Sequence, residues 1–253
     1  MTAGVEQKGN KEGKTMINSY ISIDLETTGL NPKQDKIIEI GAIKVMDGRK
    51  ADTFSTFVNP GRKLEERITE LTGITQEQVD AAPEIENVLP QLLEFLEELP
   101  LLGHRILFDY SFLKKAAVNQ KFTFEKQGID TLRIARVFLP QLEHRTLEYL
   151  CKYYEIPHTA HRAIGDAEAT SQLYQLLAEN YYGQDSRIFA PQALNYSVKR
   201  DTPATKPQKE RLQRLVELHQ ITIDCDIEKL TRSEASRYTD KIIAKYGRGT
   251  KAE

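Results

Sequence analysis

The chain has 253 residues, a formal net charge of −2 and 40% hydrophobic residues, which is enough for a substantial buried core. No apolar run approaches the ~20 residues needed to span a bilayer, which argues against a membrane protein. The polar, lysine-bearing start lacks the apolar centre of a secretory signal, and the two cysteines have no CxxC or zinc spacing. We therefore expect a cytoplasmic protein with reduced thiols.

The chain begins with a polar stretch that is followed by three strands. Residues 1–16 carry no apolar periodicity, and we expect a disordered leader there. Three strand-like runs follow within residues 20–59. The Asp47-Gly48 pair predicts a hairpin turn between the second and the third of them.

The first of these strands carries two acids. Its apolar residues alternate with Asp24 and Glu26. Because side chains on a strand alternate between its two faces, both carboxylates fall on the same side, about 7 Å apart. The sequence therefore predicts an acidic pair at the end of a buried strand.

Two further acids occur at helix starts. An apolar strand is predicted near residues 99–103, followed by a helix over 108–119. Asp109 precedes Phe112 and Leu113 by three and four residues, so it lies on the core-facing side of that helix. A helix over 163–181 places Asp166 on its apolar face, in the first turn. The other predicted helices cover residues 84–98, 131–138 and 146–154.

Each of the four acids alone has an ordinary explanation. A carboxylate in a first helical turn is favoured by the helix dipole, and an acidic strand face can be solvated. Four acids on otherwise apolar faces instead predict a metal site, because buried carboxylates need a cation or another partner. Oxygen-only ligands select Mg²⁺, Mn²⁺ or Ca²⁺ over zinc. Such a cluster suits two divalent cations about 3.5–4 Å apart, the arrangement that assists phosphoryl displacement.

The segments that carry these acids resemble the three motifs of the DEDDh-type 3′-to-5′ exonucleases. The resemblance is to the epsilon proofreading subunit of bacterial DNA polymerase III and to the exonuclease module of Gram-positive replicative polymerases. It covers roughly residues 17–182, with supporting likeness at residues 35–42, 57–60, 72–75 and 130–132. The motifs are Asp24-Leu25-Glu26-Thr27-Thr28-Gly29-Leu30, Gly103-His104-Arg105-Ile106-Leu107-Phe108-Asp109 and His161-Arg162-Ala163-Ile164-Gly165-Asp166-Ala167.

The resemblance implies a catalytic role and a metal for each acid. Asp24, Glu26 and Asp166 would hold the Mg²⁺ or Mn²⁺ ion beside the attacking water. Asp24 would also reach a second Mg²⁺ or Mn²⁺ ion, which Asp109 would hold mainly through water. In-line attack on the terminal phosphorus would release a nucleoside 5′-monophosphate.

The resemblance assigns proton transfer to His161. This residue stands five positions before Asp166, as in the histidine variant of the family. An imidazole with an unperturbed pKa of about 6.5 can accept a proton from water near neutral pH. His158, three residues earlier, is the competing candidate.

The first two motifs would also bind the terminal nucleotide. Backbone groups around Thr27 and Thr28 are expected to meet the 3′-OH, and Leu30 or Phe108 to stack or wedge beside the base. Leu30 and Phe108 equally suit plain core positions. His104, in the second motif, is a further expected substrate contact.

One residue of the second motif departs from the family. The position after His104 usually holds Asn, and here it is Arg105. This change leaves the metal ligands untouched but alters how the loop or the substrate backbone is held. It also adds a cation that favours phosphate.

The predicted elements define one catalytic domain and a C-terminal appendage. Strands followed by interleaved strands and helices predict a ribonuclease H-like α/β fold, a mixed sheet flanked by helices, over residues 17–182. Residues 183–207 lose periodicity and are expected to form a linker, and residues 208–248 a small helical hairpin. A hairpin of this size scarcely buries a stable core alone, so it is expected to dock on the catalytic domain, on a partner or on DNA; a solvated tail without a binding role is the alternative. Residues 1–186 carry a net charge of −7 and residues 187–253 a net charge of +5, so the basic tail suits a phosphate backbone.

The expected substrates are single-stranded DNA 3′ ends, cut in a proofreading or repair role, with a DNA polymerase as a candidate partner. RNA 3′-end trimming is one alternative, because the motifs recur in RNA-directed relatives. A catalytically silent nucleic-acid-binding or polymerase-tethering protein is another. Retention of all four acids and His161 favours an enzyme, since a silent binder has no need of mutually repelling carboxylates.

Overall fold

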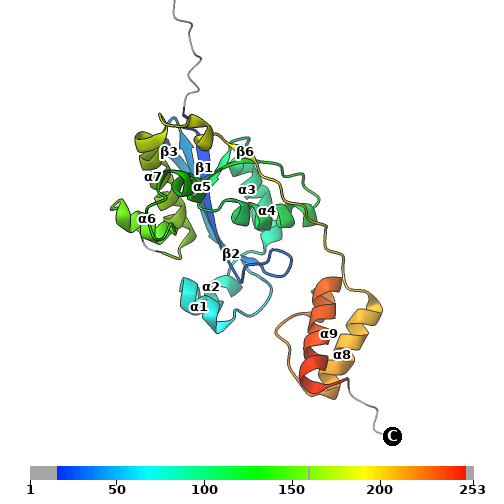
Figure 1. Cartoon of the computed structure of the whole chain (residues 1–253). Coiled ribbons are helices and arrows are strands. Elements are labelled where there is room, and N and C mark those ends of the chain that lie inside the picture. Colours follow the sequence, from blue (N-terminus) through cyan, green and yellow to red (C-terminus); the bar gives the residue numbers. More distant parts are fainter. Residues whose placement is uncertain (1–15, 159, 249–253) are drawn as a thin grey trace, which may run out of the picture.

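A six-stranded mixed sheet forms the centre of the catalytic domain in the computed structural model of this chain, which describes residues 16–158 and 160–248 (Figure 1). The strand order is β3-β2-β1-β4-β5-β6. β1 is antiparallel to β2 and parallel to β4, and β6 is antiparallel to β5. The strands are β1 (Tyr20–Thr27), β2 (Ile37–Met46), β3 (Arg49–Phe57), β4 (Leu101–Gly103), β5 (Gln127–Asp130) and β6 (Gln192–Ala193).

The turn between β2 and β3 has the geometry that its sequence predicts. Asp47 and Gly48 both have positive φ angles, 49° and 76°. A two-residue turn of this kind matches the twist of the flanking strands, so Met46 pairs with Arg49 directly across it. The three predicted N-terminal strands are therefore confirmed.

Helices cover both faces of the sheet. One face packs against α3 and α4 through side chains such as Ile21, Ile23 and Leu25 of β1. The other face packs against α5, α6 and α7. This arrangement is the mixed, helix-flanked α/β sheet expected from the sequence. The helices of the catalytic domain are α1 (Glu66–Thr72), α2 (Gln76–Asp80), α3 (Ile85–Leu96), α4 (Leu107–Asn119), α5 (Thr131–Phe138), α6 (Leu147–Tyr153) and α7 (Ala163–Tyr181).

A glycine in β2 lets α7 begin directly on the sheet. Gly41 pairs with Asp24 of β1. A Cβ atom added at Gly41 would lie 2.2 Å from the backbone carbon of Ala163, the first residue of α7. Only a residue without a side chain fits there. Gly41 thus brings the first turn of α7, with Asp166, close to the acidic end of β1.

Residues just after α7 complete the catalytic domain. The segment expected to be a linker contains a short 3₁₀ helix (Ser186–Phe189), in which Phe189 is buried against α5 and α7, and then β6. The extended segment therefore begins after β6. The expected leader, residues 1–16, lies outside the described residues except for Met16, which packs against the α7 side of the core.

The chain ends in a helical hairpin that lies apart from the sheet layers in Figure 1. It consists of α8 (Lys206–Leu218) and α9 (Arg232–Tyr246), with a 3₁₀ turn (Ile227–Lys229) between them. The two helices share their own small apolar cluster, which includes Leu212, Leu215 and Ile242. None of the helices described is long and apolar enough to cross a membrane.

Candidate metal centre

Three carboxylates meet where β1 ends. Asp24 and Glu26 project from the face of β1 that α7 covers, as their alternation predicts, and Asp166 comes from the first turn of α7. One ligand oxygen from each residue lies within 4.8 Å of the others. One hydrogen bond holds α7 here, in which the Ser22 hydroxyl donates to the carbonyl of Ala167 at 2.7 Å, and Gly41 allows the close approach.

Asp109 reaches the same strand from the opposite side. It lies in the first turn of α4, is 4% exposed, and accepts a hydrogen bond from the backbone N–H of Leu25 at 3.1 Å. It is not one of the three residues whose oxygens meet within 4.8 Å. The acids predicted from the sequence thus come together around the end of β1, with Asp109 as the outer member.

Burial and crowding raise the pKa values of Asp24, Glu26 and Asp109. Burial, followed by the nearby carboxylates of Asp109 and Asp166, raises the pKa of Asp24 well above its usual range. Burial and the charges of Asp166 and Glu39 raise the pKa of Glu26 to about 7. Burial raises the pKa of Asp109 to about 8. Without a cation, the cluster therefore favours bound protons near neutral pH.

A fifth acid, Glu39, supports the site and was not identified from the sequence. It pairs with Glu26 across β1 and β2 and is 1% exposed. Its carboxylate accepts from the Arg162 guanidinium at 3.0 Å and from the backbone N–H of Ala163 at 3.2 Å. It thereby satisfies a free N–H group at the start of α7. Its place in the apolar run of β2 was the available signal, but its role depends on strand register.

The donor set fits hard divalent cations. All the converging ligand atoms are carboxylate oxygens, which Mg²⁺, Mn²⁺ and Ca²⁺ prefer and zinc does not. A cation would replace the protons that the raised pKa values favour, and it would relieve the repulsion among the acids. Asp24, Glu26 and Asp166 are the residues placed to hold it, with Asp109 nearby.

The two candidate histidines occupy different environments. The Nε2 atom of His158 contacts the Oδ1 atom of Asp166, and its side chain is 7% exposed. His161 is exposed and has a positive φ of 64°. Within the described residues, no hydrogen bond or ion pair connects His161 to the carboxylates. The structure therefore places the competing candidate, His158, against the cluster.

The expected substrate contacts lie around the same strand end. The N–H of Thr28 donates to the carbonyl of Lys36 at 2.8 Å, which closes the loop that begins with Thr27. Leu30 projects from this loop and is 81% exposed, so it is no core residue. Phe108 packs beside Phe112 at the margin of the core, with ring centroids 5.1 Å apart.

His104 and Arg105 are held mainly by the protein itself. Both ring nitrogens of His104 have partners, the Thr131 hydroxyl at 2.9 Å and the Arg145 carbonyl at 2.8 Å. Burial lowers the pKa of His104. Arg105 has φ 76°, and its N–H donates to Asp130. That left-handed conformation suits Asn better than Arg, which is a physical reason for the Asn that the family resemblance leads us to expect here.

Carboxylates gathered at a strand end of a mixed α/β sheet define a candidate metal-dependent nuclease centre. The model of the exonuclease family (RNase_T) matches residues 21–174, and the chain belongs to this family. The chain is 40% identical over 165 residues to the DNA polymerase III PolC-type of Clostridium perfringens. That match covers 65% of this chain and 11% of the relative.

A longer match connects the chain to the DNA polymerase III PolC-type of Bacillus subtilis. The two are 32% identical over 240 residues, which covers 89% of this chain but only 17% of the relative. This match extends beyond the catalytic domain. In both comparisons the chain spans a small part of the relative's length.

Solved structures share the fold of the catalytic domain. E. coli exonuclease I in complex with a dT13 oligonucleotide aligns with a TM-score of 0.60 and 19% identity, over 68% of this chain and 44% of that one. Exonuclease X in complex with 5′-overhanging duplex DNA aligns with a TM-score of 0.54 and 24% identity, over 68% of this chain and 99% of that one. These likenesses establish the fold of the six-stranded sheet and its helices.

Proposed function

We propose that this protein is a metal-dependent 3′-to-5′ exonuclease that removes nucleoside 5′-monophosphates from DNA 3′ ends, in proofreading or repair. The convergence of Asp24, Glu26 and Asp166 within 4.8 Å, with Asp109 at the same strand end, carries this proposal. The two exonuclease structures described above hold DNA, and the PolC-type relatives are DNA polymerases, which favours DNA over RNA.

Two divalent cations, Mg²⁺ or Mn²⁺, would supply charge stabilisation for the attacking and leaving oxygens when bound. Asp24, Glu26 and Asp166 would hold one cation, and Asp24 with Asp109 the second. His161, at the loop entering α7, would take a proton from the attacking water. Its exposure leaves the ring free to approach a substrate.

The substrate loop, residues 27–36, would position the 3′ end. Thr27 and Thr28 lie directly after Glu26, so their backbone groups are close enough to the carboxylates to meet a terminal 3′-OH. The exposed side chain of Leu30 would wedge beside the terminal base, and Phe108 of α4 is the second candidate to stack there. His104 would support the site indirectly, since both of its ring nitrogens are already hydrogen-bonded within the protein.

The decisive experiment uses matched single strands labelled at the 3′ or the 5′ end, as DNA and as RNA, with Mg²⁺ or Mn²⁺. We expect immediate release of the 3′ label as a mononucleotide and stepwise shortening of the 5′-labelled DNA. Faster degradation of the RNA would favour 3′-end trimming. Binding without any cleavage would favour a silent tethering protein.

The names of the relatives also make a DNA polymerase the first partner to test by co-purification.

A further inference from the structure

The C-terminal hairpin is attached to the catalytic domain by polar contacts. Its apolar cluster joins α8 to α9 and includes no residue of the sheet layers. The chain leading to it is fixed by Asp201, which accepts from the Lys115 ammonium at 2.7 Å and from the Asn119 amide at 3.1 Å. The hairpin therefore has a core of its own and a separate, charged attachment to α4.

Glu234 connects α9 to the substrate loop. Its carboxylate lies 3.2 Å from the Lys36 ammonium and 3.7 Å from the Arg62 guanidinium, and it is 15% exposed. The same carboxylate accepts from the N–H of Thr231, which caps the N-terminus of α9. The Lys36 charge and the bond to Thr231 overcome burial and lower the pKa of Glu234 to about 2. The contact thus stays ionised throughout the physiological range.

The attached loop leads directly to the metal centre. Lys36 donates its N–H to the Thr28 hydroxyl at 3.0 Å, and Thr28 is two residues from Glu26. The substrate loop therefore begins at the carboxylates and ends against the hairpin. A strand leaving the metal centre along this loop would meet α9 next.

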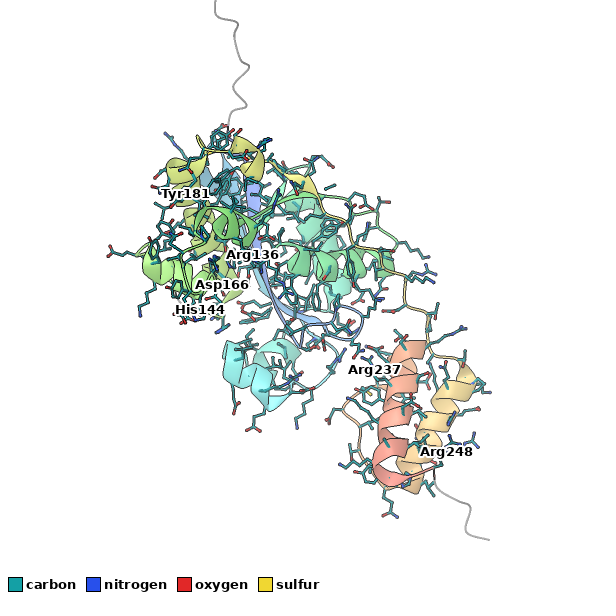
Figure 2. All side chains as sticks on the ribbon, viewed as in Figure 1. Arg136, His144, Asp166, Tyr181, Arg237 and Arg248 are labelled. Atoms are coloured by element: carbon teal, nitrogen blue, oxygen red, sulfur yellow. The ribbon has the colours of Figure 1, made fainter. Side chains whose placement is uncertain are left out.

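A cavity of about 460 Å³ lies between this loop, the C-terminal half of α4 and α9. Its size suits a nucleotide-sized group. Lys33 of the loop and Arg237 and Lys241 of α9 line it, and none of these three forms an ion pair within residues 16–158 and 160–248. Figure 2 shows Arg237 on the side of the hairpin nearest the catalytic domain.

The other charged residues of the cavity are of both signs. Its remaining cations pair with neighbouring acids, as Lys229 does with Glu84 at 3.3 Å. Asp35 and Asp226 accept from backbone N–H groups, and Glu86 is a lining acid with no ion pair among the described residues. The cavity is lined by eight basic and seven acidic residues, so its walls are weakly positive overall. Lys33, Arg237 and Lys241 are the cations left to meet the phosphates of a nucleic-acid backbone.

We propose that this cavity holds the single-stranded DNA upstream of the 3′ end, with backbone phosphates at Lys33, Arg237 and Lys241. The proposal rests on the proposed function and makes it more specific, because it names the second half of the substrate site. It assigns substrate binding to one face of α9 and leaves the outward face of α8 without a role. The hairpin thereby extends the substrate-binding site beyond the 3′-terminal nucleotide.

The test compares two double variants of the full chain. Arg237→Gln with Lys241→Gln removes two charges from the cavity, and Arg211→Gln with Arg214→Gln removes two from α8. Binding of labelled dT20 is measured by fluorescence anisotropy in EDTA at several salt concentrations, and hydrolysis of a dinucleotide is measured with Mn²⁺. Thermal unfolding of both variants controls for folding.

We expect the α9 variant to bind dT20 about tenfold more weakly. The slope of log affinity against log salt should fall by roughly 1.4, because each single-strand phosphate contact contributes about 0.7. Dinucleotide turnover should stay unchanged, and the α8 variant should bind as the parent does. Equal weakening by both variants, or unchanged binding in the α9 variant, would overturn the proposal.

Two further outcomes separate the occupant and the activity. Matched rU20 that binds more tightly than dT20, and loses the same affinity in the α9 variant, would replace DNA with RNA as the occupant. The unsubstituted protein could also bind dT20 through Arg237 and Lys241 and yet hydrolyse neither dT20 nor the dinucleotide. That result would contradict the proposed function alone. In that case the cavity would still be a DNA-binding site.

Discussion

The imidazole of His158 lies against the carboxylate of Asp166, eight positions further along the chain. His161 would transfer the proton, whereas His158 touches a carboxylate placed to hold a cation. Replacing each histidine should therefore affect different kinetic quantities. We expect His161→Ala to lower kcat by roughly 10²–10⁴ at saturating Mn²⁺. His158→Ala should instead raise the Mn²⁺ concentration needed, by about 10–100-fold, because it removes the partner that orients Asp166.

Mn²⁺ titrations of activity for both histidine variants separate these two effects. Recovery of kcat at high Mn²⁺ in His158→Ala would assign that residue to positioning. A loss at saturating metal in His158→Ala, with normal turnover in His161→Ala, would transfer the role of base to His158.

Removing one carboxylate should abolish activity and yet stabilise the protein without metal. EDTA should abolish cleavage, and Mg²⁺ or Mn²⁺ should restore it. We expect Asp24→Asn to lower the cleavage rate at least a hundredfold. Its metal-free melting temperature should rise, since burial and neighbouring charges disfavour the Asp24 carboxylate. Asp52→Asn, on the exposed strand β3, is the matched control and should change neither the cleavage rate nor the melting temperature. Normal cleavage by Asp24→Asn would refute the metal-site assignment.

Metal binding should depend steeply on pH. Glu26 and Asp109 have pKa values of about 7 and about 8 in the folded protein, above those of free carboxyl groups. The folded state therefore binds more protons than the unfolded state between pH ~4 and ~8, and these groups destabilise the metal-free protein as pH rises through that window. A cation competes with the same protons, so its affinity should be roughly tenfold or more weaker at pH 6 than at pH 8.

Thermal unfolding with and without Mn²⁺ at several pH values measures this dependence. The shift caused by Mn²⁺ should grow from pH 6 to pH 8, while the metal-free melting temperature falls. A shift independent of pH would mean that the acids are already ionised in the folded protein.

Gly41 should tolerate no side chain. The added Cβ of Gly41→Ala would lie 2.2 Å from the backbone of Ala163, so either the sheet or the start of α7 must move. We expect a loss of about 3 kcal/mol in the free energy of unfolding, together with the loss of activity, since Asp166 moves with α7. Gly183→Ala is the control, because nothing lies within 4 Å of its added Cβ. Its unfolding free energy should stay within about 0.5 kcal/mol. Denaturant unfolding measures both.

Arg105→Asn should stabilise the protein. The φ of 76° at Arg105 is costly for a long side chain, and Asn tolerates it better. Because the N–H bond to Asp130 is retained, we expect a gain of about 1 kcal/mol, measured by denaturant unfolding. A loss of stability would show that the Arg105 side chain makes a compensating contact. A higher KM for dT20 in this variant would show that the cation also serves the substrate.

The long elements were predictable because their periodicity extends over several turns. The helix predicted over residues 163–181 matches α7, and the alternation in β1 placed Asp24 and Glu26 on one face. Several short elements gave no such signal. β6 has two exposed residues and exists only through pairing with β5, and α1 and α2 are one to two turns long. The pairing of Glu39 with Glu26 depends on register, which no single strand encodes.

The histidines show a second limit. Spacing along the chain cannot tell which of His158 and His161 faces the acids, because the loop between α6 and α7 turns through a positive φ at His161. The approach of Asp109 from the far face of the sheet is likewise a property of layer packing.

The order in which the carboxylates occur along the chain has a consequence during synthesis. Asp24 and Glu26 leave the ribosome first, and Asp109 follows with α4. The group is completed only by Asp166, whose placement needs α7 to pack on β1 and β2. A nascent chain that ends before α7 therefore cannot bring the three carboxylates together, so the proposed cation site forms only when the domain closes.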